Sequence, residues 1–185
     1  MDVSEAGAIP AVRSRQDELY NEAAVNYGPA MERLAHAYEA DSEIRRDLIQ
    51  EIHIALWRSF ATFDGRCSLR TWIYRVAHNV ATSHVIKQRR AKGSGLVGLE
   101  ELENLPDARK DHETTDRNQD LARLMDFIQR LKPLDRQVIL SYLEGMDAAS
   151  IGEITGLSAR YVSTKIYRIK EMLARRFNAG GRNDE

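Results

Sequence analysis

The sequence predicts an all-α protein of two small helical domains joined by a flexible acidic linker, the C-terminal domain containing a helix-turn-helix. Apolar residues recur at the three- and four-residue spacing of amphipathic helices in both halves of the chain, and strand-like alternation persists nowhere. Residues 92–118 are rich in glycine and acidic side chains and have weak periodicity, which is typical of a linker. We therefore expect domains at 16–91 and 119–178, with disordered ends at 1–15 and 179–185.

The net charge of −1 conceals a strong segregation of charge along the chain. Residues 64–92 carry seven basic side chains against one acidic one. Residues 99–126 carry nine acidic side chains against four basic ones, and residues 159–177 carry six basic against one acidic. Two separated basic segments can each neutralise phosphates, which favours a nucleic-acid partner.

Several classes of function find no support in the sequence. The single Cys67 cannot form an internal disulfide, and no cysteine or histidine spacing resembles a zinc site, so we expect neither a metal nor another cofactor. The absence of a Ser/His/Asp set and of a phosphate-binding glycine loop argues against an enzyme. No signal-peptide core and no run of ~20 apolar residues is present, which predicts a cytoplasmic protein without membrane insertion.

The first two helices are expected on either side of Asp41. Helical periodicity begins near Gln16, and Tyr27-Gly28-Pro29 indicates a break or a Pro-initiated turn. Asp41-Ser42 is a plausible N-cap pair for a helix over 43–60. The expected core stripe of this helix is Ile44, Leu48, Ile52, Ala55 and Leu56.

Burying that stripe leaves a largely polar outer face on the same helix. Trp57 on such a face is typical of an interface anchor. The alternative is that Trp57 packs into the core, and the pattern of this helix alone does not decide between the two positions. Either His53 or Ile54 continues the face. An acidic, polar face of this kind suits docking onto another protein. The candidate docking residues are Asp47, Gln50, Glu51, His53 and Trp57.

Aromatic and basic residues interleave in the next helix, which is predicted over 69–90 with Ser68 as its cap. Its expected core positions are Trp72, Val76 and Val80, with Ile73 in addition. Aromatic rings beside cations suit melted DNA, in which unstacked bases need a stacking platform, and the loop 63–68 can accept an extruded base. The competing interpretation is that Trp72 and Val76 are core residues alone. The candidate DNA-binding residues are Ser68, Arg70, Thr71, Trp72, Arg75, Asn79 and Ser83.

The C-terminal domain is expected to start with a helix from Leu121 to Leu131, which Pro133 ends, and a helix over 134–144, which Gly145 ends. Residues 147–158 then predict a short helix, a turn at Gly156 and a capping Ser158.

The helix after Ser158 has one apolar stripe, formed by Val162, Ile166, Ile169 and Leu173. Its other faces are basic and polar, and a recognition helix reads bases from its N-terminal residues. A plain helical hairpin with a solvated basic face is the alternative. The candidate DNA-binding residues are Ser158, Arg160, Tyr161, Thr164, Lys165 and Arg168.

Over residues 20–178 the chain resembles the bacterial sigma factors of the sigma-70 family, specifically the extracytoplasmic-function (ECF) group. The segments that carry the resemblance are 47–51 with Trp57, then 68–79 and 131–170. Gly152 departs from the family pattern, in which alanine is usual at this position.

The resemblance implies a transcription initiation factor whose partners are core RNA polymerase and promoter DNA, and in some cases an anti-sigma factor. It implies that the candidate docking residues bind core polymerase. The 68–83 set would bind the minus-10 element and the 158–168 set the minus-35 element. The alternative is a stand-alone helix-turn-helix regulator that binds duplex DNA without core polymerase.

Overall fold

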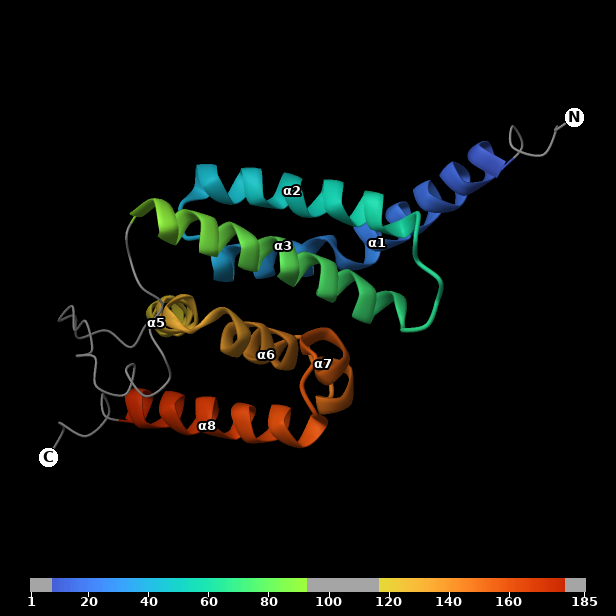
Figure 1. Ribbon diagram of the computed structural model, residues 1–185. Helices are drawn as coiled ribbons and strands as arrows, with labels where there is room; N and C mark the ends of the chain where they lie inside the picture. The colour runs from blue at the N-terminus through green and yellow to red at the C-terminus, as the bar shows by residue number, and fades with distance from the viewer. Residues whose placement is uncertain (1–7, 93–116, 179–185) are drawn as a thin grey trace, which may run out of the picture. The chain divides into compact units, whose positions relative to one another are not determined.

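A computed structural model describes residues 8–92 and 117–178 of the protein, and within these ranges every regular element is an α-helix, as predicted. The described residues divide into two compact units, with the division between Gln88 and Arg89. The helices, labelled in Figure 1, are α1 (Ala8–Tyr38), α2 (Ser42–Phe60), α3 (Leu69–Lys92), α5 (Arg117–Arg130), α6 (Pro133–Leu143), α7 (Ala148–Thr155) and α8 (Ala159–Asn178). Most of the predicted linker, and the ends at 1–7 and 179–185, lie outside the described residues.

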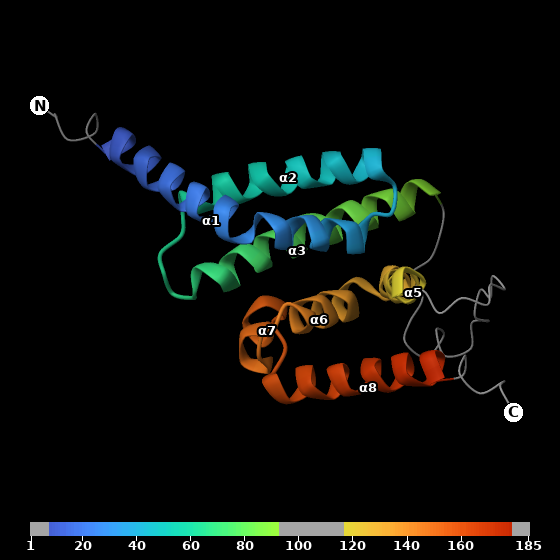
Figure 2. The ribbon, with the colours of Figure 1, turned by 180° about the vertical axis from the view of Figure 1, so that it is seen from behind.

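Helix α1 differs from its prediction at both the start and the middle. It begins at Ala8, not near Gln16, and it continues through Gly28 and Pro29 to Tyr38. A proline inside a helix costs about 3 kcal/mol through a lost hydrogen bond and a steric clash. The exposed Pro29 precedes Ala30 and Met31, which are both buried, so packing offsets that cost. The axis of α1 bends along its length (Figure 2).

Helix α2 follows the predicted cap and most of the predicted stripe. The side chain of Asp41 accepts hydrogen bonds from the backbone N–H groups of Glu43 and Ile44, at 2.9 and 3.2 Å. The buried residues are Leu48, Ile52, Leu56 and Phe60, while Ile44 and Ala55 are half-buried.

Helix α3 has the predicted cap, but its buried face is not the predicted one. The Ser68 hydroxyl accepts a hydrogen bond from the Thr71 N–H at 3.0 Å. The expected core residue Ile73 is buried, whereas Trp72, Val76 and Val80 are only half-buried. The face that packs against the other helices consists of Ile73, Tyr74, Ala77, His78, Ala81 and Val85. Apolar residues follow two neighbouring stripes of α3, and the stripe with small alanines permits the closer approach of a second helix.

His78 lies at the centre of this three-helix unit and is fully buried. Its Nδ1 atom is 2.9 Å from the hydroxyl oxygen of Tyr38 on α1, and its ring also lies beside that of Tyr74. Desolvation by burial lowers the pKa of His78 from its ordinary value of 6.5 to about 3. The imidazole is therefore neutral at physiological pH.

In the C-terminal unit, a buried arginine fixes the corner between α5 and α6. Arg136 Nε donates to the carbonyl oxygen of Ile128 at 3.0 Å, and its guanidinium also donates to the carbonyls of Gln129 and Leu131. The carbonyls of Ile128 and Gln129 lie in the last turn of α5, which lacks intrahelical donors, and that of Leu131 follows directly after it. Pro133 does not end α5, which stops at Arg130, but starts α6 at the position that proline favours.

The predicted helix-turn-helix is formed by α7 and α8. Asp147 caps α7 by accepting from the Ser150 N–H at 2.8 Å. Gly156 ends α7 with a φ of 76°, in the left-handed region that glycine adopts at little cost. The Ser158 hydroxyl accepts from the Tyr161 N–H at 3.3 Å at the start of α8. The local signals for caps and turn are thus confirmed.

We expect Gly152→Ala to destabilise the C-terminal unit by ~1–3 kcal/mol. A Cβ atom at this position would lie 2.6 Å from the backbone carbonyl oxygen of Leu157, which cannot move without displacing the turn. Gly28→Ala is the matched control, because open space surrounds that position within α1 and alanine should stabilise the helix by ~0.5–1 kcal/mol. Chemical denaturation followed by circular dichroism measures both. Equal stability of Gly152→Ala and the parent would contradict the close approach.

Candidate functional site

The outer face of α2 presents two carboxylates, an amide and one apolar side chain to solvent. Asp47, Gln50 and Glu51 are exposed, as the sequence pattern predicts. Ile54 lies on the same face with 51% of its surface exposed. The sequence left His53 and Ile54 as alternatives for this face, and Ile54 is the one that the structure exposes there. An exposed isoleucine among acidic and polar groups suits a protein partner with basic side chains and an apolar contact.

His53 and Trp57 are turned toward α1 and are half-buried. His53 Nδ1 lies 3.1 Å from the Tyr20 hydroxyl, and Trp57 Nε1 donates to Asp17 Oδ1 at 2.8 Å. Trp57 is thus neither a core residue nor a fully solvated one. These contacts between α1 and α2 depend on the first turns of α1. The sequence predicted this helix only from near Gln16, whereas it begins at Ala8.

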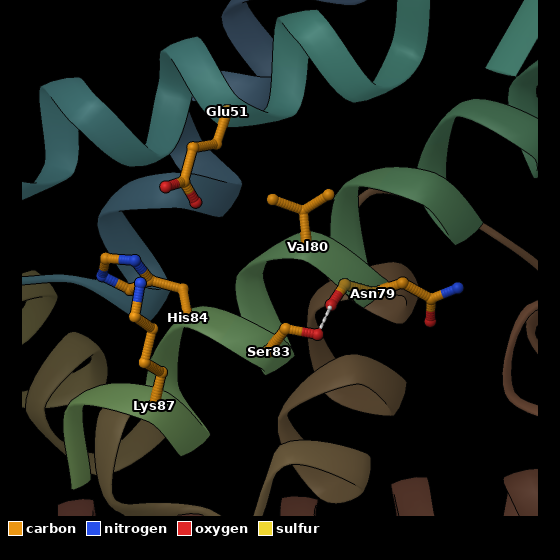
Figure 3. Close-up of a pocket in the computed structure, with 6 residues that line it drawn as sticks. All are labelled: Glu51, Asn79, Val80, Ser83, His84 and Lys87. Carbon is orange, nitrogen blue, oxygen red and sulfur yellow. Dashed lines mark hydrogen bonds between the residues drawn. The ribbon is translucent and has the colours of Figure 1, made fainter. Parts of the chain in front are cut away.

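A groove of about 350 Å³ separates the outer face of α2 from α3 (Figure 3). Glu51 projects from α2 toward it, and His84 and Lys87 project from α3. His84 is held by contacts with Glu39 at 3.4 Å and Gln88 at 3.0 Å. The remaining residues that line the groove are Asn79, Val80 and Ser83.

Trp72 joins the start of α3 to the end of α2 and to the loop between the two helices. Trp72 Nε1 donates to Ser59 Oγ at 2.9 Å, and its ring lies 5.3 Å from that of Phe63. The indole is half-buried, so part of its surface remains accessible to solvent. Thr71 is buried at 2% exposure, and its hydroxyl contacts that of Ser68 at 2.9 Å. Thr71 therefore helps to hold the cap and offers little surface to a ligand.

An exposed polar line follows α3 toward its C-terminus. Asn79 and Ser83 are both exposed, and the Ser83 hydroxyl donates to the Asn79 carbonyl at 2.8 Å. Lys87 and Arg90 continue this line at helical spacing and are also exposed. These two cations are not among the residues predicted from the sequence, although their helical spacing from Asn79 indicates the same face. Arg70 and Arg75 are half-buried, and the Arg70 guanidinium lies 5.8 Å from the centre of the Tyr74 ring.

The first turns of α8 expose a polar and basic face. Arg160, Thr164 and Arg168 are exposed, and Tyr161 is 50% exposed. Tyr167, which is 63% exposed with its hydroxyl 2.9 Å from Glu171, lies between Thr164 and Arg168 along this face. Tyr167 is not among the residues predicted from the sequence. Tyr167 lies seven residues, or two helical turns, after Arg160, and this spacing predicts that the two side chains share a face.

Lys165 does not lie on the outer face of α8, where the apolar stripe of the helix predicts it. Its Nζ atom is 2.5 Å from Asp135 Oδ1 of α6, and the two side chains are 14% and 6% exposed. The step of three from Val162 to Lys165 turns the lysine toward α6. Val162, Ile169 and Met172 form the buried face of α8, while Ile166 and Leu173 are half-buried.

Two family models match these two units. Residues 24–91 match the model described as Sigma-70 region 2, and residues 121–173 match Sigma-70, region 4. Two helical units with these matches, the second carrying a helix-turn-helix, define a transcription initiation factor of the sigma class. The chain belongs to the sigma-70 family, within its extracytoplasmic-function group, which confirms the resemblance in the sequence.

Curated relatives cover nearly the whole chain. The ECF RNA polymerase sigma-E factor of Haemophilus influenzae is 26% identical over 178 residues, covering 92% of this chain and 94% of the relative. The ECF RNA polymerase sigma-E factor of Escherichia coli K12 is 24% identical over 174 residues, covering 89% and 90%.

Two solved structures share the fold. CnrH, in complex with the cytosolic domain of CnrY, is 19% identical and has a TM-score of 0.65, covering 92% of this chain and 94% of that one. The sigma factor RpoE of Bartonella quintana, in complex with the anti-sigma factor NepR, is 15% identical and has a TM-score of 0.63, covering 86% and 96%. None of the helices within 8–92 and 117–178 combines the length and the apolar character that crossing a bilayer requires.

Proposed function

We propose that this sigma factor uses the exposed face of α2 to bind core RNA polymerase, α3 with its preceding loop to bind the minus-10 element, and α8 to bind the minus-35 element. The observation that carries the proposal is that the acidic docking face and the basic face of α8 belong to different helical units, so one chain can hold polymerase and DNA together. Binding in the cytoplasm, where polymerase and promoters lie, is part of the proposal.

The docking step rests on the chemistry of α2. Asp47, Gln50 and Glu51 supply hydrogen-bond acceptors and negative charge, and Ile54 supplies an apolar contact one turn further along α2. Complementary charge on the polymerase would speed association and set the orientation of docking. A buried apolar or aromatic anchor would supply most of the binding free energy.

The minus-10 step rests on α3. The rings of Trp72 and Phe63 are both half-buried and lie 5.3 Å apart, and together they can offer an aromatic surface to an unstacked base. The exposed line of Asn79, Ser83 and Lys87 offers hydrogen bonds and a positive charge to a DNA strand that runs along the helix. Since Thr71 is buried, its place in this set is structural.

The minus-35 step rests on the first two turns of α8. Arg160 is the earliest long donor on the exposed face, so it is best placed to reach a base edge in the major groove. Arg168, two turns further along, is better placed for a phosphate. The ion-paired Lys165 is not available for either role in this conformation.

We expect Arg160→Ala to relax the preference for one or two base pairs of the minus-35 element, each worth ~1–3 kcal/mol. Arg168→Ala should weaken all promoters alike and lower the dependence of binding on salt concentration. Selection of randomised promoter DNA with each variant bound to core polymerase measures the preference, and salt titrations measure the slope.

Parallel selections without core polymerase separate this proposal from a stand-alone regulator. A sigma factor should select bipartite sites only when core polymerase is present. Selection of the same duplex by the free protein would favour the stand-alone regulator. Equal, sequence-independent losses from both arginine variants would remove base recognition from α8.

We extend the proposal to an anti-sigma partner. Both solved relatives were determined in complexes, and the partner of the Bartonella quintana protein is an anti-sigma factor. A protein that covers the docking face of α2 would prevent polymerase binding by occupying the same residues.

A further inference from the structure

We propose that the N-terminal turns of α1 form a clasp that holds Trp57 in the orientation in which it docks on core polymerase, with Asp17 as the positioning residue. The clasp consists of Gln16, Asp17 and Tyr20 on α1. The inference rests on the proposed docking role of α2. It adds a stretch of chain that lies before the matched region 2, which begins at residue 24.

Two hydrogen bonds join the clasp to Trp57 itself. Asp17 Oδ1 accepts from the indole Nε1 at 2.8 Å, and Gln16 Nε2 donates to the Trp57 carbonyl oxygen at 2.6 Å. That carbonyl lies in the last turn of α2, where a regular helix supplies no donor. Gln16 is buried at 6% exposure, so its amide replaces the missing backbone donor from the neighbouring helix.

A third contact lies one turn earlier on α2. The Tyr20 hydroxyl is 3.1 Å from His53 Nδ1, and the two rings meet edge to face at 5.9 Å. One turn of α1, residues 16–20, thus contacts one turn of α2, residues 53–57. Residues three or four apart lie on the same face of a helix. The two docking candidates that are not fully exposed are the two that α1 holds.

Asp17 is the member of the clasp that suits a docking role better than a folding role. Its side chain is exposed, and a hydrogen bond between exposed groups contributes little to the free energy of folding. The bond does restrict the rotation of the half-buried indole. A side chain that is already ordered loses less conformational entropy when it is buried by a partner.

The bond also prepares the indole for burial. A tryptophan N–H that is covered by a partner without an acceptor leaves an unpaired buried donor, which is costly. Asp17 supplies the acceptor before docking.

The test measures the dissociation constant of full-length variants for core RNA polymerase, with helicity checked by circular dichroism. We expect Asp17→Ala to weaken binding by about tenfold, which is the loss of one hydrogen bond to a charged acceptor. Asp17→Asn keeps an acceptor oxygen for the indole and should stay within about threefold of the parent. Glu18→Gln, an exposed neighbour, is the charge-matched control and should bind like the parent.

A double-variant cycle tests whether Asp17 acts through Trp57. In a Trp57→Phe background, which lacks the indole N–H, Asp17→Ala should cause no further loss. An equal loss in both backgrounds, or no loss in either, overturns the clasp. Asp47→Ala reports on docking itself: if it weakens binding while Asp17→Ala does not, the clasp fails and the docking face stands. If Asp47→Ala and Trp57→Ala both bind like the parent, the docking role of α2 fails.

Discussion

Replacing Asp135 with alanine should lower the free energy of unfolding of the C-terminal unit by about 3 kcal/mol. The substitution leaves the ammonium group of Lys165, which is 14% exposed, without the carboxylate that lies 2.5 Å from it. Removing one partner of a buried ion pair is costly because the remaining charge has lost its hydration without compensation. Partial access of Lys165 to solvent keeps the effect near the lower end of the usual range.

The Asp126–Arg130 pair supplies a matched control. These side chains are 56% and 36% exposed and lie 2.9 Å apart, so Asp126→Ala should change the unfolding free energy by less than about 1 kcal/mol. A double variant, Asp135→Ala with Lys165→Met, should lose less than the sum of the two single losses, because it leaves no unpaired charge. Urea denaturation measures all four variants. Additive losses would show that the pair is not a coupled unit.

Acid should destabilise the N-terminal unit through His78, at about 1.4 kcal/mol per pH unit between pH 6.5 and the folded-state pKa of about 3. Burial holds the folded-state pKa below the ordinary value of 6.5, so the unfolded chain binds a proton across this window and the folded one does not. The stability contributed by neutral His78 is therefore complete above pH 6.5 and falls as the pH is lowered. The hydroxyl of Tyr38 and the ring of Tyr74 lie beside the imidazole.

His78→Asn isolates this effect, because asparagine keeps a hydrogen-bonding atom for the Tyr38 hydroxyl but does not titrate. The loss of unfolding free energy between pH 7 and pH 4.5 should be smaller in the variant than in the parent, by ~2–3 kcal/mol. His36→Asn, at an exposed position of α1, is the control and should retain the slope of the parent. An unchanged slope in His78→Asn would show that the protein opens locally to admit the proton.

Signals that act over a few residues were readable in the sequence. Asp41, Ser68 and Ser158 cap helices because their side-chain oxygens reach the N–H groups two or three residues ahead. Gly156 ends α7 because a residue without Cβ adopts the left-handed conformation at little cost. The order of helices in each unit and the helix-turn-helix followed from such signals, and so did the family, since its motifs lie within single helices.

The choice between competing faces was not readable in the sequence. Helix α3 has apolar residues on two adjacent stripes. The stripe of Ile73, Ala77 and Ala81 is buried against the other helices, whereas Trp72 on the second stripe is only half-buried. The apolar stripe of α8 predicts that Lys165 lies on the outer face, but Asp135, thirty residues earlier, holds it against α6. Both outcomes depend on groups distant in the chain, which periodicity within one helix does not report.

The sequence by itself determined the helices, their caps, the helix-turn-helix and the class of protein, because each depends on free energies that neighbouring residues supply. Only the tertiary structure decided that α1 runs unbroken past Pro29, and that its first turns hold Trp57 through Asp17. Burial of Ala30 and Met31 offsets the free-energy cost of a proline inside a helix, and only that cost is visible in the sequence. The physical reason is that burial is a property of the assembled unit, whereas capping and backbone preference are properties of a few adjacent residues.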